Sequence, residues 1–165
     1  MLLKQLYAKL EKSNEFKKFK SENPDAFLCA GFFIINFKDN KFEYSLDYRN
    51  DKQIFTFKIP ENDSSIIAES QDLLLSPKPL DKINLDVQVD IEDIKDIVEK
   101  TLSDNNIKNK LEEYIAVLQN LDNQLVWNLT IMCEGFTIIN SLINAETSGI
   151  IKFEKKNLLD FIKKQ

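Results

Sequence analysis

The spacing of apolar residues predicts a helix in two parts of the chain. Over residues 2–21 apolar side chains recur close to helical spacing, with Lys and Glu between them, and this pattern predicts one amphipathic helix that ends before Asn23-Pro24-Asp25. A second helical stripe covers residues 90–102. Asp90 is placed to cap this helix, because Asp93 follows three residues later and the acidic first turn suits the positive end of the helix dipole.

The other apolar segments predict strands that follow one another along the chain. Residues 27–37 are apolar on both faces, which is typical of a strand covered on both sides. Residues 42–48 alternate between apolar and polar, which predicts a half-buried strand, and residues 53–59 predict a third. After the second helix, strands are expected at 112–119, 124–133, 136–145 and 150–154, followed by a short final helix capped by Asn157.

Each half of the chain therefore has one helix followed by an antiparallel meander. We expect an α+β fold with helices packed on one face of the sheet, built from two related halves in one compact globule. The first unit covers residues 1–60 and the second covers 89–165. Residues 61–88 form a junction or extra elements, in which 64–75 fits either a short helix or a strand, and Ser76-Pro77-Lys78-Pro79 breaks it.

One local repeat supports a duplication. Residues 29–36 and 133–140 agree at six of eight positions. This match pairs a strand in one half with a hairpin turn in the other, so we give more weight to the order of the elements than to the octapeptide.

The composition excludes several kinds of chemistry. The chain has 165 residues and no His, which removes imidazole zinc sites and Ser-His or Cys-His dyads. Its three glycines are too few for a Gly-rich phosphate loop, and Arg49 is the only Arg available for a bidentate phosphate clamp. We therefore expect no enzyme activity, no cofactor and no metal.

The charge and the cysteines suggest a location and exclude some partners. A net charge of −5 argues against nucleic acid or an anionic membrane as the partner. No apolar run reaches 18 residues, and charged residues interrupt the opening segment before it could serve as a signal peptide. Cys29 and Cys133 lie in apolar runs and are expected to be buried free thiols in a reducing compartment. These features predict a cytoplasmic protein.

The second half resembles the PepSY domain, a small helix-plus-meander module, over residues 89–154. The resemblance is carried by the acidic-capped helix, by the strand around Trp127 and by the turn Asn144-Ala145-Glu146-Thr147-Ser148-Gly149. In this turn Asn144 replaces the acidic residue of the family, and Ser148 is inserted before Gly149. The resemblance implies a non-catalytic module that binds or inhibits peptidases or sensors, and whose family members are mostly extracytoplasmic.

A few residues are candidates for function as well as for structure. The acidic cluster of Asp86, Asp90, Glu92, Asp93 and Asp96 offers oxygen ligands for a hard cation, although helix capping accounts for it equally simply. The thiols lack the flanking signals of a reactive cysteine. Trp127, Tyr44 and Tyr48 are candidate partner-binding residues, with burial in the core as the alternative. The basic C-terminal residues are expected to form a solvated face.

The sequence thus predicts a non-enzymatic module that binds a protein or peptide and is inhibitory or regulatory in role. Binding would occur by strand addition at a free sheet edge or in a groove between helix and sheet. One alternative is a small-molecule pocket protein, a hydrolase or isomerase that uses paired carboxylates. Another is a structural subunit of a homo-oligomer.

Overall fold

The computed structural model describes residues 1–73 and 80–163, without the side chains of residues 161 and 163, and it shows an α+β fold. The expected break at Ser76–Pro79 lies outside the described residues. The helices are α1 (Leu3–Lys12), α2 (Asn14–Glu22), α3 (Ile91–Asp104) and α4 (Leu158–Lys163). The strands are β1 (Phe27–Asn36), β2 (Lys41–Arg49), β3 (Gln53–Lys58), β4 (Ile67–Asp72), β5 (Leu111–Leu121), β6 (Gln124–Cys133), β7 (Thr137–Asn144) and β8 (Ile150–Asn157).

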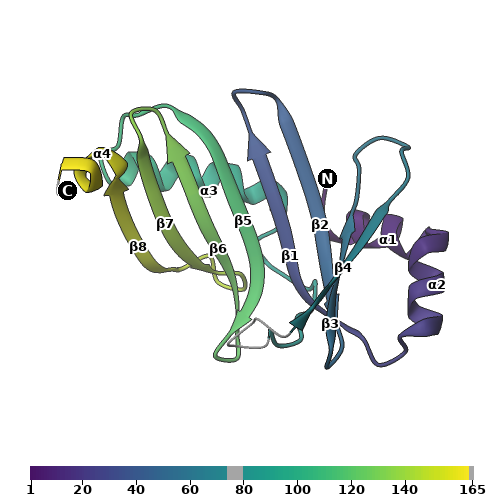
Figure 1. Ribbon diagram of the computed structural model, residues 1–165. Helices are drawn as coiled ribbons and strands as arrows, with labels where there is room; N and C mark the ends of the chain where they lie inside the picture. The colour runs from purple at the N-terminus through teal and green to yellow at the C-terminus, as the bar shows by residue number, and fades with distance from the viewer. Residues whose placement is uncertain (74–79, 164–165) are drawn as a thin grey trace.

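All eight strands belong to one antiparallel sheet with the order β4-β3-β2-β1-β5-β6-β7-β8. Each meander runs outward from the middle of the sheet, where β1 pairs with β5 from Gly31↔Leu118 to Asn36↔Glu113 (Figure 1). The sequence left open whether the two half-sheets join or pack face to face. They join edge to edge, because the first strand of each meander is free to pair with the other.

The N-terminal helical segment is two helices, which corrects the single helix expected over residues 2–21. Ser13 has an extended backbone (φ −72°, ψ 146°) and separates α1 from α2. Its hydroxyl oxygen accepts a hydrogen bond from Phe16 N at 3.2 Å and so caps α2. The bend lets Leu6 and Leu10 of α1 and Phe16 and Phe19 of α2 all face the sheet, whereas a straight helix would carry one set past its edge.

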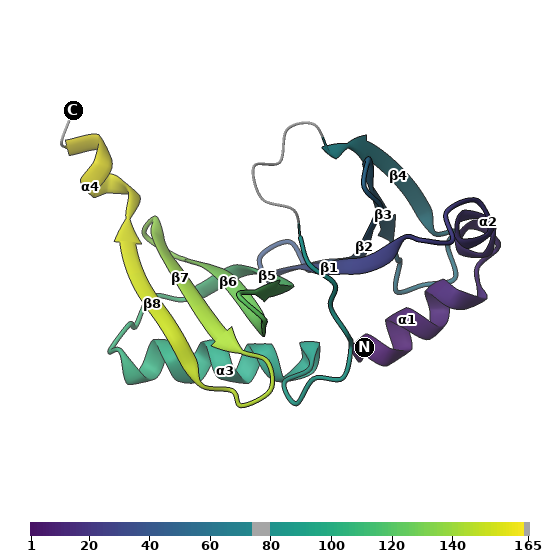
Figure 2. The same cartoon turned by 90° about the horizontal axis from the view of Figure 1, so that it is seen from below.

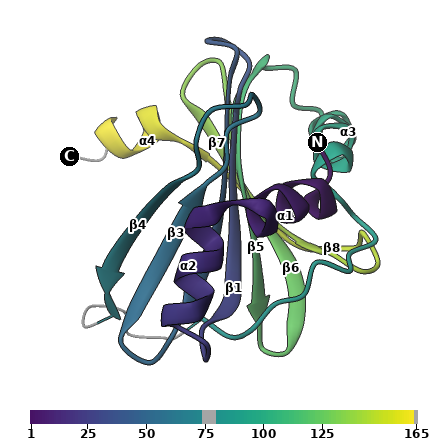
Figure 3. The same ribbon diagram turned by 90° about the vertical axis from the view of Figure 1, so that its right-hand side faces the viewer.

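The hydrophobic core lies between α1, α2 and α3 and one face of the sheet. Figure 2 shows α1 and α3 on the same side of the sheet, and Figure 3 shows α1 and α2 as a bent pair in front of the first meander. Phe16 and Phe19 pack against Tyr48 and Phe57 with ring centroids 5.0–5.6 Å apart. In the second half α3 buries Ile94 and Val98, and Trp127 is fully buried.

The opposite face of the sheet carries no packed helix among the described residues. Because cross-strand neighbours share a face, the row Phe32, Ile34, Ile115 and Val117 lies opposite the core residue Phe33. Phe32 is exposed, and the other three residues of the row are half-buried. The expectation that residues 27–37 form a strand covered on both sides is therefore wrong from Phe32 onward, although Ala30 on the same face is buried. We call this surface the helix-free face.

Residues 61–88 contain an extra strand and a connecting segment. Of the two alternatives for residues 64–75, a short helix or a strand, the structure shows a strand, β4, which is exposed and lies at the edge of the sheet. The sequence predicted only three strands for the first half. The segment after residue 80 then binds both halves through backbone hydrogen bonds. Ile83 N donates to Leu28 O at 3.0 Å, and Val89 N donates to Ala145 O at 3.0 Å.

Several local predictions are confirmed. Asp90 caps α3, and Asp90 N donates to Asp93 Oδ2 at 2.8 Å to complete the capping box. The strand predicted at 124–133 has those bounds as β6, and Leu159 N donates to Asn157 Oδ1 at the start of α4. Figure 1 shows α4 beyond the edge of the sheet. No helix in the described ranges is long and apolar enough to cross a membrane.

Candidate functional site

The helix-free face has a hollow of about 510 Å³ beside β2, which we call the β2 hollow. Its apolar lining includes two exposed side chains of this face, Phe32 and Ile67, with exposed fractions of 37% and 56%. Phe42 also borders the hollow, from a register position that shares the core face with Ile35. Its polar lining comes from Glu43, Ser45, Asp47, Thr56, Lys58, Ser64 and Ser65. An apolar wall with a few polar groups is the usual composition of a binding site.

The strand register explains why a hollow forms here. Phe32 on β1 lies beside Ser45 on β2, which lies beside Lys58 on β3, and Lys58 lies beside Ile67 on β4. In the next row Asp47 lies beside Thr56. Because the side chains of Ser45 and Thr56 are small, the surface is depressed between the bulkier side chains of Phe32 and Ile67. The hollow is thus a product of residue size at paired positions across four strands.

Asp47 is the unusual polar group of the hollow. Its Oδ1 atom is buried and has no hydrogen-bond partner within the described chain. Burial raises the pKa of this carboxyl above its ordinary value, and an interaction with the Thr56 hydroxyl lowers it by a smaller amount. An unpaired carboxylate oxygen in an apolar setting costs free energy until a donor reaches it.

Asp47→Asn should stabilise the protein at neutral pH, by an amount that shrinks on acidification. The folded-state pKa of Asp47 lies above the unfolded value, so the folded protein holds this proton more tightly. The stability that Asp47 contributes is therefore present at low pH and is lost as pH rises from the ordinary carboxyl pKa through the raised one. Urea unfolding at several pH values measures the effect.

Asp25→Asn removes the same charge from an exposed turn and controls for net charge. If Asp47→Asn lowered the free energy of unfolding at neutral pH, or kept its full gain below the ordinary carboxyl pKa, the account of this carboxyl would be wrong.

The structure places the three predicted partner-binding residues in the core and does not bring them together at a surface. Trp127 packs against Phe33, with ring centroids 5.6 Å apart, and its Nε1 donates to Val89 O at 2.8 Å. Tyr48 lies under α2, and burial raises the pKa of its hydroxyl. Tyr44 belongs to the lining of the β2 hollow, but it is buried, and the register places its ring on the core face beside Phe33. None of the three rings is available to a partner in this structure.

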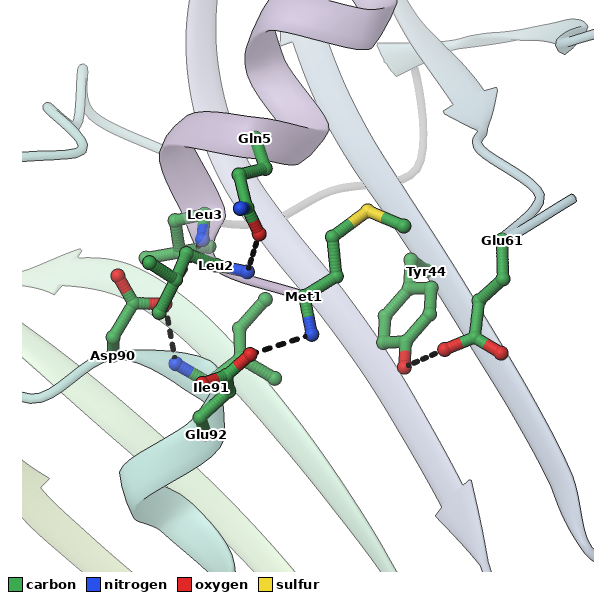
Figure 4. A network of polar contacts seen from close by, with 9 residues as sticks. All are labelled: Met1, Leu2, Leu3, Gln5, Tyr44, Glu61, Asp90, Ile91 and Glu92. Carbon is green, nitrogen blue, oxygen red and sulfur yellow. Dashed lines mark hydrogen bonds and ion pairs between the residues drawn. The ribbon is translucent and has the colours of Figure 1, made fainter.

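A polar network joins the amino ends of α1 and α3 on the core side (Figure 4). Asp90 Oδ1 accepts from Ile91 N at 2.7 Å and from Leu3 N at 2.9 Å, so one carboxylate serves both helices. The amino group of Met1 pairs with Glu92 at 2.9 Å. These contacts hold the two halves together, which makes them structural.

Beside this network the Tyr44 hydroxyl donates to Glu61 Oε1 at 2.8 Å. Burial raises the pKa of the Tyr44 hydroxyl, and the hydrogen bond to Glu61 and its negative charge raise it further by a smaller amount. The pair therefore favours a protonated tyrosine and a carboxylate acceptor, an arrangement suited to holding the 59–66 loop in place.

The other candidates also have structural positions. Within residues 1–73 and 80–163, no three His, Cys, Asp or Glu side chains come together to hold a metal ion. Asp90 and Asp93 of the acidic cluster cap α3. Cys29 is buried, and desolvation, with a smaller contribution from the negative charge of Asp47, raises the pKa of its thiol to about 12. The thiol is therefore a poor nucleophile. Burial also raises the pKa of Cys133.

Of the residues that line the β2 hollow, the sequence singled out Tyr44 alone, whose ring is buried. Phe32 was one of many apolar residues in its strand, and Asp47 was one polar position in an alternating strand. The sequence feature that could have indicated the site is Asp47, a carboxylate between Leu46 and Tyr48, both of which are buried in the core. Its partners across β1, β3 and β4 depend on register, which the sequence did not specify.

Comparison with known proteins supports the fold and leaves function open. No protein-family model matches the chain, and no curated protein sequence matches it. The chain is similar to a crystal structure from Clostridium difficile 630, of a protein provisionally described as a lipoprotein. The TM-score is 0.58 and the identity 16%, covering 89% of this chain and 97% of the other. At that identity the likeness concerns the fold alone.

Proposed function

We propose that this protein is a non-enzymatic module that binds a protein or peptide segment through the β2 hollow. The observation that carries the proposal is the pair of exposed large apolar side chains, Phe32 and Ile67, on opposite sides of one hollow. Exposed apolar side chains grouped in this way mark interaction sites more often than scattered ones do. The half-buried row Ile34, Ile115 and Val117 extends the apolar surface along the same face.

The free sheet edges support strand addition less well. The outer strand β8 carries Lys152, Lys155 and Lys156, all exposed, and charged side chains of this kind protect an edge from pairing. The other edge, β4, is short and carries Glu69 and Asp72. A groove between α2 and β3–β4 measures about 310 Å³ and is lined by several charged side chains. The β2 hollow is larger and more apolar in its walls.

The experiment is a selection of displayed random 12-residue peptides on the immobilised protein. Peptides held in the β2 hollow should lose affinity by about tenfold or more with Phe32→Ser or Ile67→Ser, because each substitution removes an apolar contact. Phe136→Ser is the matched control, since Phe136 is also an exposed phenylalanine but lies in the β6–β7 turn. Circular dichroism checks that all three variants stay folded.

Two results would contradict the proposal. One is the absence of any enriched peptide. The other is enrichment of peptides whose affinity falls with Phe136→Ser and is unchanged by Phe32→Ser and Ile67→Ser.

The small-molecule alternative has one observation in its favour, the buried Asp47 carboxyl in the hollow. Paired-carboxylate chemistry needs a second acid close by. Glu43 lies four residues along the same strand, about 13 Å away. That separation exceeds the spacing at which two carboxyls act on one bond, so binding is better supported than acid–base catalysis.

We infer further that the two halves are related copies and that residues 89–154 are PepSY-like. The mirrored strand order about β1 and β5 supports this inference. The octapeptide match does not, because residues 29–36 lie within β1 whereas 133–140 span the end of β6 and the start of β7.

A cytoplasmic location also stays a prediction, and the lipoprotein description of the similar structure favours the membrane surface instead. Cell fractionation distinguishes the two.

A further inference from the structure

We propose that the β2 hollow receives a basic side chain, Lys or Arg, from an apolar segment of a partner protein, with Asp47 as its counter-ion. This inference rests on the proposed function and specifies the chemistry of the occupant. It follows from the charges in the hollow, from the unpaired Asp47 oxygen and from the continuity of the apolar surface around them.

The charges in the hollow are not balanced. Lys58 is the basic residue of the lining, and its ammonium is already paired with Glu69 Oε1 at 2.9 Å. Glu43 and Asp47 remain as acidic groups of the same lining. Within the lining an incoming cation therefore meets an excess of negative charge. Arg49, two residues along β2 and outside the lining, donates from Nη1 to Leu80 O at 3.2 Å.

Asp47 provides the specific contact. Its buried Oδ1 has no donor within the described chain, so an ammonium or guanidinium that reached it would form a charge-assisted hydrogen bond. Such a bond removes the cost of a desolvated, unpaired carboxylate oxygen. The aromatic ring of Phe32 in the lining suits the methylene stem of Lys or the flat guanidinium of Arg.

The surroundings favour a segment of polypeptide over a small free amine. Ile67 lies on the β4 side of the hollow with a 56% exposed side chain. On the other side, beside Phe32, the half-buried residues Ile34, Ile115 and Val117 continue the apolar surface. An isolated amine would leave these residues in water. A segment with apolar residues beside its basic residue would cover them.

The test compares synthetic peptides that differ in one side chain. The probes are N-acetyl-Phe-Lys-Phe amide and the same peptide with norleucine in place of Lys, which keeps the four-carbon stem and removes the charge. Amide chemical shifts of the isotope-labelled full chain follow each titration. The Lys peptide should bind about tenfold more tightly than the norleucine peptide and should shift signals of residues that line the hollow.

Variants of the protein separate a charge effect at Asp47 from a general one. Asp47→Asn should reduce the preference for Lys to within about twofold. Glu154→Gln removes one negative charge from β8 on the same face, outside the hollow, and should preserve the preference. Salt should weaken the Lys peptide and leave the norleucine peptide unchanged.

The outcomes distinguish this inference from the proposed function. Equal binding of both peptides in the hollow, or a Lys preference that survives Asp47→Asn, contradicts the inference that the hollow receives a basic side chain. Either result remains consistent with the proposed peptide binding. No shift at the hollow with either peptide, together with no enriched library peptide, overturns both. If n-butylammonium alone bound as tightly as the Lys peptide, the hollow would be an amine site and the partner segment would be wrong.

Discussion

Trp127→Ala should lower the free energy of unfolding by about 3–5 kcal/mol, a larger loss than we expect from any other single substitution in this protein. Trp127 is fully buried and is among the largest buried side chains. Its removal leaves a cavity beside Phe33 and also leaves Val89 O without the indole donor. Urea unfolding followed by circular dichroism measures the loss, since Trp127 is the single tryptophan and fluorescence would vanish with it.

Trp127→Phe keeps an aromatic ring in the site but loses the hydrogen bond, so its loss should be about half as large. Phe136→Ala is the surface control and should change the free energy of unfolding by less than about 0.5 kcal/mol. A loss below about 1 kcal/mol with Trp127→Ala would mean that this ring is not part of a tightly packed core, and would make Trp127 a candidate for surface binding again.

Asp90→Ala should lower the free energy of unfolding by about 2–3 kcal/mol, more than an ordinary cap. A single N-cap contributes about 1 kcal/mol. Asp90 in addition accepts the Leu3 N–H at the start of α1, and a part-buried N–H left without an acceptor adds to the loss. Thermal or urea unfolding gives the value.

Two neighbours serve as controls for Asp90. Asp93→Ala removes only the bond from Asp90 N and should cost about 1 kcal/mol. Asp96→Ala removes the same charge from an exposed position of α3 and should have little effect. Equal losses at positions 90 and 93 would show that the contact with α1 adds nothing to stability.

Much of the fold could be predicted because local patterns specify it. The capping box at Asp90 and Asp93 needs only residues three apart, and the strand at 124–133 needs only its alternation and its turns. The bend at Ser13 was missed for a related reason. Apolar spacing continues across it, so the sequence predicts one helix, and the Ser13 cap becomes visible only when both helices have to reach the same sheet.

The candidate site was less predictable because it depends on register and coverage. The β2 hollow takes Phe32, Asp47, Thr56 and Ile67 from four strands, and each strand pairing adds a choice of register that the sequence does not state. Aromatic residues in alternating strands looked like contact residues. Tyr44, Tyr48 and Trp127 turned out to lie on the face that the helices cover, and burial there outweighs their suitability for binding.

By itself, the sequence determined the elements, their order and the α+β class, because helix periodicity, strand alternation and caps are properties of neighbouring residues. The tertiary structure alone decided that β1 and β5 join the two meanders into one sheet, and that one face of this sheet is left without a helix among the described residues. It also decided that Asp47 Oδ1 lies without a hydrogen-bond donor from the described chain on that face. These outcomes depend on contacts between residues far apart in the chain, where pairing and burial are settled by the whole molecule.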